Sequence, residues 1–132
     1  MGEHELWNEL GNLYFLSGAY PQAVHAYHRS IQLDEGFGRP YSNLALTYVQ
    51  QGKFDEAVDL YRRSIELLAE NKEKAISWNR LGNVYRYLRD YQEALVAYKK
   101  ADELRALLMS KGIEVQDGPK GPTVRFAAGQ RR

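Results

Sequence analysis

The feature that most constrains this chain is an internal repeat. Residues 7–14 (WNELGNLY) return as residues 41–48 (YSNLALTY) and again as residues 78–85 (WNRLGNVY), at steps of 34 and then 37 residues. Downstream of each block, alanines, tyrosines and small residues recur at constant offsets: Ala23, Ala57 and Ala94; Tyr27, Tyr61 and Tyr98; Ser30, Ser64 and Ala101. A period of this length indicates one supersecondary unit copied in tandem, in which stacked neighbours bury a continuous core.

Apolar residues within each block follow the spacing of a helix. In the first block Trp7, Leu10 and Tyr14 recur at three- and four-residue steps, which is one face of an α-helix. Small residues beside that face, such as Gly11, allow two helices to approach at the short end of the roughly 8–10 Å interaxial range. Turn-type residues separate the two halves of each unit. The sequence predicts helices over about 4–17, 20–33, 39–51, 54–69, 72–88 and 91–111.

These blocks resemble the tetratricopeptide repeat, whose pattern runs Trp, two residues, Leu-Gly, two residues and Tyr, followed by Ala, aromatic and Ala positions. The resemblance covers about residues 4–108. It implies an all-α, right-handed superhelical solenoid of three helix-turn-helix pairs, at about 4–37, 38–74 and 75–108. Residues 109–132 are expected to hold the end of the last helix and an irregular C-terminal tail, with extended pieces near 113–116 and 123–126.

Two departures from the family pattern stand out. The proline that usually closes each unit is absent, with Glu35, Ala69 and Ala106 in its place. Three extra residues near 69–72 account for the longer second step of the repeat. They predict a longer exit from the second helix pair.

Composition narrows the classes of function. The chain has 132 residues, 18 basic and 17 acidic, and its net charge of +1 gives no overall attraction to nucleic acid or membrane. It has no cysteine, which excludes disulfides, thiolate metal sites and a cysteine nucleophile. No apolar run approaches the roughly 18 residues of a membrane span, and the polar, acidic start is unlike a signal peptide. The sequence therefore predicts a cytoplasmic protein.

No catalytic or metal-binding signature is present. The sequence contains no Ser-His-Asp arrangement, phosphate-binding glycine loop or zinc motif. His25 and His28 lie three residues apart on one predicted helix, a spacing that can hold a metal, but no third ligand is in register with them. A solvated helix surface is the expectation there. The sequence predicts a non-enzyme with no cofactor and no metal site.

The family architecture places the first helix of each pair on the inner, concave wall of the superhelix. Residues between the signature positions on that wall are not needed for packing and are free to bind a ligand. The predicted peptide-binding residues are Asn8, Asn12, Phe15, Arg39, Asn43, Leu46, Asn79, Arg80, Asn83, Arg86 and Tyr87. Asparagine and arginine dominate this set and only Glu5, at its rim, is acidic, so we expect a mildly basic groove.

The chemistry of these residues suits a peptide. An asparagine amide offers one acceptor and two donors, so a row of them can pair with both the N–H and the C=O groups of an extended backbone. The arginines add a preference for carboxylates, which a guanidinium binds bidentately. The apolar members, Phe15, Leu46 and Tyr87, are expected to supply pockets. The predicted ligand is an extended peptide or protein segment lying across Asn12, Asn43, Asn79, Arg80 and Asn83.

The carboxylate-clamp subfamily offers a closer comparison. Its members hold the acidic C-terminal tails of heat-shock chaperones with a lysine and an asparagine from the first unit, an asparagine from the second, and a lysine and an arginine from the third. Asn12, Asn43 and Arg80 occupy three of these five positions, while Asn8 and Ile76 replace the two lysines. The partial resemblance implies a groove built in the same way for a less acidic or internal segment.

Three alternatives compete with peptide binding. The groove residues can equally form a polar, solvated surface with no ligand. Self-assembly into a homo-oligomer is suggested by the end of the array, where no polar capping helix follows and Leu104, Leu107 and Leu108 are expected to leave apolar surface open. That surface would be covered by the tail, by a second copy, or by further repeats of a longer chain. Nucleic-acid binding through the groove arginines is disfavoured by the near-neutral charge.

Overall fold

The computed structural model describes residues 1–113 and shows them as stacked helices. Their bounds are α1 (Glu3–Leu16), α2 (Tyr20–Leu33), α3 (Arg39–Gln50), α4 (Phe54–Leu67), α5 (Asn71–Tyr87) and α6 (Tyr91–Ser110). Every predicted helix is present, with ends within two residues of the expected ones. Residues 114–132, with most of the expected tail and its extended pieces near 113–116 and 123–126, lie outside the described residues.

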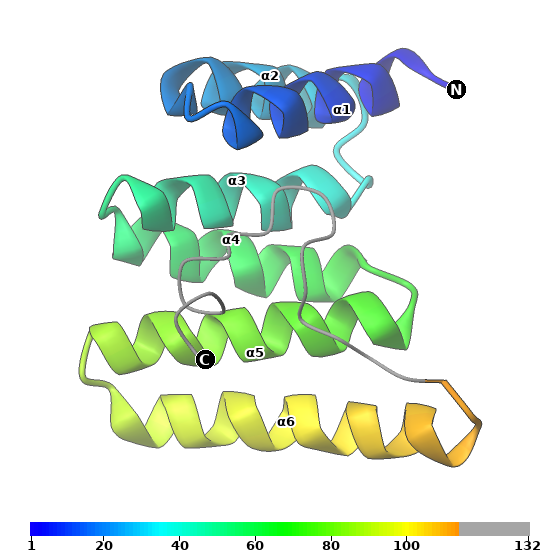
Figure 1. The fold of residues 1–132 in the computed structure, drawn as a ribbon, viewed down its shortest axis with the longest axis vertical. Helices are drawn as coiled ribbons and strands as arrows, with labels where there is room; N and C mark the ends of the chain where they lie inside the picture. The colour runs from blue at the N-terminus through cyan, green and yellow to red at the C-terminus, as the bar shows by residue number, and fades with distance from the viewer. Residues whose placement is uncertain (114–132) are drawn as a thin grey trace.

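The helices stack in chain order as three pairs (Figure 1). Contacts are most extensive within the pairs α1–α2, α3–α4 and α5–α6, and next between α2 and α3 and between α4 and α5. The first helices α1, α3 and α5 also touch one another directly. They therefore form one wall and the second helices the other, so the protein is an all-α helical repeat solenoid, as predicted.

Close approach within a pair depends on a small residue in the first helix. A Cβ built on Gly11 would lie 2.5 Å from Cε1 of Tyr27, and one built on Gly82 would lie 2.7 Å from Cε1 of Tyr98. Both distances are far below van der Waals contact, so any larger residue would displace the ring. The ring of the tyrosine in the second helix therefore packs directly against the backbone of the signature glycine.

The turn inside each pair also repeats. Gly18 and Gly52 adopt left-handed backbone conformations, with φ of 83° and 77°, and the third turn places Arg89 there, with φ of 66°. The following backbone N–H donates to the carbonyl of the signature tyrosine five residues earlier, at 2.8–2.9 Å in all three turns. This bond satisfies a carbonyl that the helix end would otherwise leave without a partner.

The hydrophobic core lies between consecutive units. One cluster gathers around Tyr27 and Leu44 and the other around Tyr61 and Leu81, and each joins residues of successive units. Most of the aromatic signature residues therefore pack in or against these two clusters. Two cations of the second helices lie over tryptophan rings of the first helices: Arg29 over Trp7 and Lys100 over Trp78, each 5.5 Å from the ring centroid.

The last helix differs from the expectation. Leu108 is buried and Leu104 half-buried, and only Leu107 of the three expected leucines is exposed. The exposed apolar side chains of α6 lie mainly in its first half, where Tyr91 and Leu95 are 58% and 63% exposed. Of the leucine surface expected to need a cover at the end of α6, only Leu107 is therefore open.

Candidate functional site

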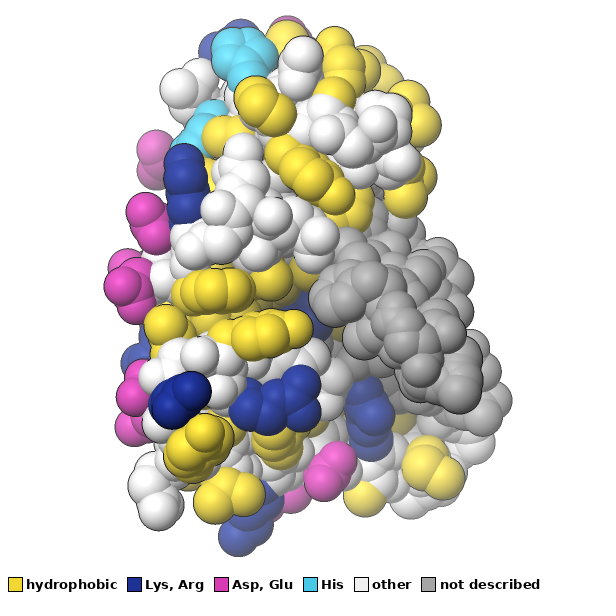
Figure 2. Space-filling model, turned by 60° about the vertical axis from the view of Figure 1, so that its left-hand side comes forward, with side chains coloured by type: hydrophobic (Ala, Val, Ile, Leu, Met, Phe, Trp, Pro, Cys, Tyr) yellow, Lys and Arg dark blue, Asp and Glu magenta, His cyan; other side chains and the backbone are white. Residues whose placement is uncertain are grey.

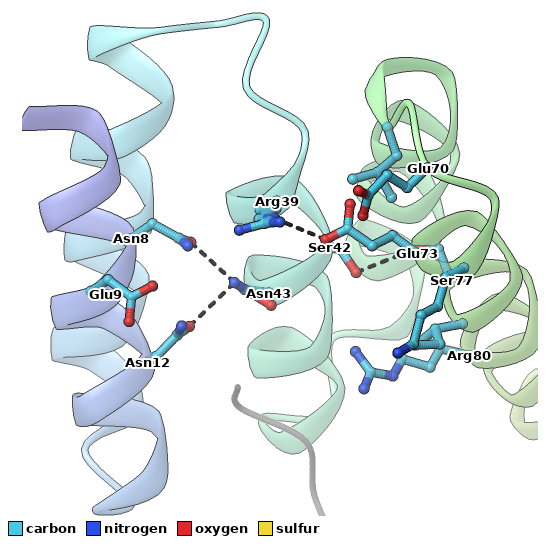
Figure 3. Close-up of a pocket in the computed structure, with 13 residues that line it drawn as sticks. Asn8, Glu9, Asn12, Arg39, Ser42, Asn43, Glu70, Glu73, Ser77 and Arg80 are labelled. Carbon is cyan, nitrogen blue, oxygen red and sulfur yellow. Dashed lines mark hydrogen bonds and ion pairs between the residues drawn. The ribbon is translucent and has the colours of Figure 1, made fainter. Parts of the chain in front are cut away.

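A polar groove of about 460 Å³ lies along the wall of first helices (Figure 3). Its lining comes from α1, α3, the exit of α4 and the first half of α5: Asn8, Glu9, Asn12, Arg39, Ser42, Asn43, Leu68, Glu70, Lys72, Glu73, Ile76, Ser77 and Arg80. The predicted residues that the structure brings together there are Asn8, Asn12, Arg39, Asn43 and Arg80.

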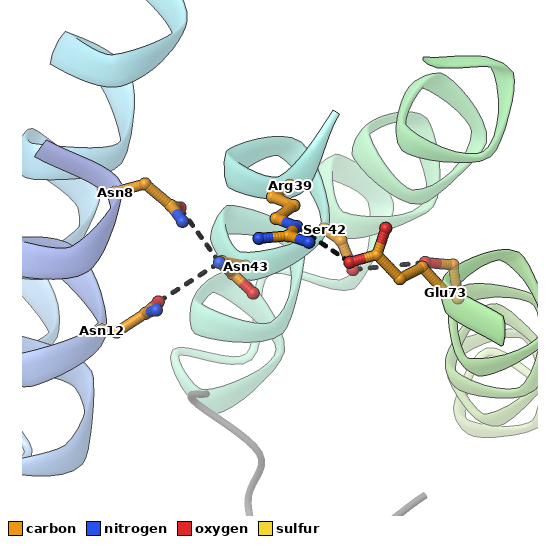
Figure 4. Close-up of polar contacts among 7 residues, drawn as sticks. Asn8, Asn12, Arg39, Ser42, Asn43 and Glu73 are labelled. Carbon is orange, nitrogen blue, oxygen red and sulfur yellow. Dashed lines mark hydrogen bonds and ion pairs between the residues drawn. The ribbon is translucent and has the colours of Figure 1, made fainter. Parts of the chain in front are cut away.

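Three asparagines form a hydrogen-bonded network at the centre of the groove. Nδ2 of Asn43 donates to Oδ1 of Asn8 at 3.0 Å and to Oδ1 of Asn12 at 3.2 Å (Figure 4). Asn8 is only 3% exposed, so its main role is to orient Asn43. Since Asn43 directs its donors toward α1, its carbonyl oxygen and the NH₂ group of Asn12 are the amide groups that remain for a ligand.

A tyrosine of the second helix holds the asparagine of the first in two of the units. The Tyr27 hydroxyl donates to Oδ1 of Asn12 at 2.7 Å, and the Tyr98 hydroxyl donates to Oδ1 of Asn83 at 2.5 Å. Burial raises the pKa of both tyrosines, with Glu9 adding to the effect at Tyr27. Both hydroxyls therefore stay protonated at neutral pH and keep these amides in one orientation.

The groove carries both signs of charge, which corrects the expectation of a mildly basic surface with one acidic residue at its rim. Its glutamates are Glu9, Glu70 and Glu73, and its cations are Arg39, Lys72 and Arg80. Nε of Arg39 donates to Oε2 of Glu73 at 2.8 Å, an ion pair that joins α3 to α5 (Figures 3 and 4). The longer exit from α4 brings the first turn of α5, with its acidic side chains, into the groove.

Two of the three expected apolar pocket residues are buried. Phe15 and Leu46 are 4% and 7% exposed and belong to the cluster around Tyr27 and Leu44. Phe15 also packs against Tyr20, with ring centroids 5.4 Å apart. The prediction that these two positions are not needed for packing was wrong, because the helices approach closely enough to enclose them.

Tyr87 is exposed but lies apart from the groove. Its ring stacks on Phe54 at a centroid distance of 5.3 Å and an interplanar angle of 17°. The two rings line a separate hollow of about 230 Å³ with Val49 and Gln50, at the ends of α3 and α5. The remaining predicted residues of α5, Asn79, Asn83 and Arg86, are also outside the groove lining.

Sequence reasoning missed most of the α5 side of the groove. Lys72, Ile76 and Arg80 lie at four-residue steps on one face of α5, and all three line the groove. That spacing was the signal that could have identified Lys72. On α3, Ser42 lies beside Asn43, and its hydroxyl is 3.3 Å from that of Ser77 in a buried contact between α3 and α5.

His25 and His28 are both exposed on α2, as expected for a solvated helix surface, and each has one neighbouring ring. His28 Nε2 lies 3.3 Å from the Tyr48 hydroxyl, and the His25 ring meets Trp7 edge-on at 6.1 Å. Among residues 1–113, no three histidine, aspartate or glutamate side chains come together in a way that could hold a metal ion. Nor does this part of the chain contain a helix long and apolar enough to cross a bilayer.

Stacked helix pairs with a polar groove along the wall of first helices define an all-α helical-repeat solenoid. The sequence model of the tetratricopeptide repeat matches residues 3–70 and 37–106, and the chain belongs to this family. No curated protein sequence gave a significant match.

Solved structures of other tetratricopeptide-repeat proteins share the fold. MamA superposes with a TM-score of 0.76 at 24% identity, over 81% of this chain and 61% of that one, so this chain spans about three fifths of its length. The first tetratricopeptide-repeat domain of Spaghetti (RPAP3), bound to the HSP90 peptide SRMEEVD, superposes with a TM-score of 0.73 at 25% identity. The match covers 79% of this chain and 80% of that one. The N-terminal domain of STI-1 from C. elegans superposes with a TM-score of 0.73 at 24% identity, over 82% of this chain and 90% of that one.

Proposed function

We propose that this chain is a non-catalytic scaffold that binds an extended peptide or protein segment in the groove between α1, α3 and α5. The observation that carries the proposal is the network of Asn8, Asn12 and Asn43, whose amides are held in set orientations by one another and by Tyr27. A carbonyl oxygen on Asn43 and an NH₂ group on Asn12 complement the two polar groups of a peptide backbone. Side chains that are already ordered lose little conformational entropy when the ligand binds.

The comparison with Spaghetti supports a peptide as the ligand. That domain, of the same fold and 25% identical, holds the HSP90 peptide SRMEEVD. In this chain Asn12, Asn43 and Arg80 match three of the five clamp positions, and Lys72 lines the groove one turn before Ile76, where the clamp has a lysine. We place a ligand carboxylate against Lys72 and Arg80 on the α5 side.

The glutamates refine the class of ligand. Glu9, Glu70 and Glu73 would repel a densely acidic tail, whereas a basic side chain on the ligand would pair with them. With both signs of charge lining one groove, the best ligand is a segment that carries a carboxylate and a basic residue within a few positions of each other. A uniformly acidic tail is expected to bind more weakly.

Fluorescence-anisotropy titrations with three labelled peptides of equal length test this function. The peptides are a sequence with acidic but no basic residues, an internal sequence with alternating acidic and basic residues, and a neutral sequence. The mixed-charge peptide should bind tightest. Arg80→Ala should weaken its binding about 10-fold or more, since a charged hydrogen bond contributes roughly 1.5–3 kcal/mol. Asn43→Ala should lower the affinity for every peptide that binds the unmodified chain.

The matched control is Arg63→Ala, which removes an exposed arginine on α4 that pairs with Glu66 away from the groove. It should leave every affinity unchanged. Circular dichroism of each variant separates a loss of binding from a loss of fold. If the Asn43 and Arg80 variants fold and bind all three peptides as tightly as the unmodified chain, the groove is not the binding site.

A further inference from the structure

The end of the solenoid formed by α1 exposes an apolar stripe. Leu6, Leu10 and Leu13 are 55%, 36% and 64% exposed and follow one another at four- and three-residue steps on one face of the helix. Figure 2 shows apolar side chains gathered at the top of the molecule, over the first helix pair. Contiguous exposed apolar surface of this kind marks an interaction site more often than a solvated one.

In the other two units the same repeat positions are interior. The equivalents of these leucines are Pro40, Leu44 and Thr47 in α3, and Ser77, Leu81 and Val84 in α5. All six are less than 2% exposed. Their cover is the second helix of the preceding unit, since α2 packs on α3 and α4 packs on α5. The leucine stripe is thus the docking surface of the repeat, and it is more apolar than either internal copy.

The two helices that cover this surface share a pattern. An aromatic, a valine, a tyrosine and an isoleucine follow at steps of four, three and four residues: Tyr20, Val24, Tyr27 and Ile31 in α2; Phe54, Val58, Tyr61 and Ile65 in α4. The residue after the tyrosine contacts the signature tyrosine of the next unit. His28 Nε2 is 3.3 Å from the Tyr48 hydroxyl, and Arg62 Nε donates to the Tyr85 hydroxyl at 2.9 Å.

Helix α6, at the opposite end, carries nearly the same pattern. Tyr91, Leu95 and Tyr98 occupy the aromatic, aliphatic and tyrosine positions, and Lys99 stands where α2 and α4 have a histidine and an arginine. Tyr91 and Leu95 are 58% and 63% exposed. The departure is Asp102, which replaces the isoleucine. The two ends of the molecule are therefore matching halves of the interface that joins its internal units.

We propose that two copies of this chain stack head to tail, with α6 of one copy on the leucine stripe of α1 in the next. Lys99 then donates to the hydroxyl of Tyr14, the signature tyrosine of α1. The interface is heterologous, because each added copy presents a further leucine stripe, so the assembly grows with concentration and does not close as a dimer. Asp102 limits its strength, because its carboxylate enters the contact that an isoleucine makes in the internal interfaces.

Sedimentation velocity of the full chain over a wide range of concentrations tests the proposal. The average mass should rise with concentration. Asp102→Ile should lower the concentration of half-association about 10-fold or more, since it replaces a charge that the proposed interface would cover by an aliphatic side chain. Leu10→Lys and Leu95→Lys should each remain monomeric. Leu33→Lys, at an exposed leucine outside both faces, is the control and should associate like the unmodified chain.

Mixing the two blocked variants identifies the pairing. Leu10→Lys keeps an intact α6 face and Leu95→Lys keeps an intact leucine stripe, so an equimolar mixture should form a complex of two chains and nothing larger. The proposal is overturned if the unmodified chain and the Asp102→Ile variant both stay monomeric throughout. It is also overturned if Leu95→Lys associates like the unmodified chain while Leu10→Lys does not, because that result indicates pairing of two leucine stripes across a twofold axis.

Discussion

At the residue scale, one ion pair, between Arg39 and Glu73, is already formed in the groove before a ligand arrives. Arg39 and Glu73 are 56% and 28% exposed, so their ion pair contributes at most about 1 kcal/mol to folding. Its larger effect is on binding. Because Glu73 accepts from the Arg39 guanidinium, a ligand carboxylate must compete with it for the same donors.

Glu73→Gln should therefore strengthen the binding of carboxylate-bearing peptides. The substitution removes the competing charge and leaves Arg39 in place, and we expect about a 3- to 10-fold gain in affinity for SRMEEVD. Urea unfolding should change by less than about 1 kcal/mol. The matched control, Glu66→Gln, breaks the exposed pair with Arg63 and should not alter affinity. An unchanged or weaker affinity for SRMEEVD would contradict this role of Glu73.

His28 should make stability depend on pH. Partial desolvation on the surface of α2, and to a lesser extent the neighbouring His25, lowers the pKa of His28 below its ordinary value. The unfolded chain then binds a proton at a higher pH than the folded chain, so stability should fall as the pH drops below about 6.5 and level off below the folded pKa. In the His28→Gln variant, the free energy of unfolding measured with urea should fall less between pH about 7.5 and pH about 5.5 than in the unmodified chain. If the variant loses as much stability as the unmodified chain, His28 is not the titrating group.

At the scale of elements, the three turns inside the pairs are alike except at one residue. Gly18 and Gly52 occupy the left-handed position at no steric cost, whereas Arg89 occupies it with a side chain. The left-handed region costs a residue other than glycine roughly 1–2 kcal/mol. The third turn is therefore the strained one, although its hydrogen bond from Asp90 to the carbonyl of Tyr85, at 2.9 Å, is within 0.1 Å of the other two.

Arg89→Gly should stabilise the protein. The relief of strain exceeds the added entropy of a glycine in the unfolded chain, and we expect a gain of about 0.5–1 kcal/mol in the free energy of unfolding. The reciprocal change, Gly52→Arg, should lose about as much or more. Urea denaturation of both variants provides the measurement. A less stable Arg89→Gly variant would show that the arginine makes contacts worth more than the strain.

The helices could be predicted because several independent signals agree: the repeat offsets, the apolar face and the turn-type residues between the halves of each unit. The start of α5 had only an indirect signal. Three residues inserted near 69–72 leave no register to copy from the other units, and the structure begins α5 at Asn71. The predicted start, at about residue 72, was within one residue of this. The first turn of α5 has no helical counterpart in α3, however, so the repeat alignment did not place Lys72 and Glu73 in the groove. The burial of Phe15 and Leu46 depends on helix separation, which sequence spacing does not determine.

At the scale of the whole molecule, the repeat that builds the solenoid also determines its surfaces. The wall of first helices carries the groove, with Asn12, Asn43 and Arg80 predicted from the family pattern and Glu9 revealed by the structure. The apolar ends are the two halves of the internal interface. The sequence indicated an open apolar surface at the last helix, but it did not reveal the one on α1. Leu6, Leu10 and Leu13 have the spacing of ordinary packing residues, and only the fold shows that no preceding helix covers them.

Peptide binding along the wall of first helices can be tested by titrating the ¹⁵N-labelled chain with the mixed-charge peptide. The signals to follow are those of the backbone amides and the asparagine side-chain amides. We expect the largest shifts on α1, α3 and the first half of α5, including the side-chain amides of Asn12 and Asn43. Shifts confined to α2, α4 and α6, or to the hollow between Phe54 and Tyr87, would contradict it.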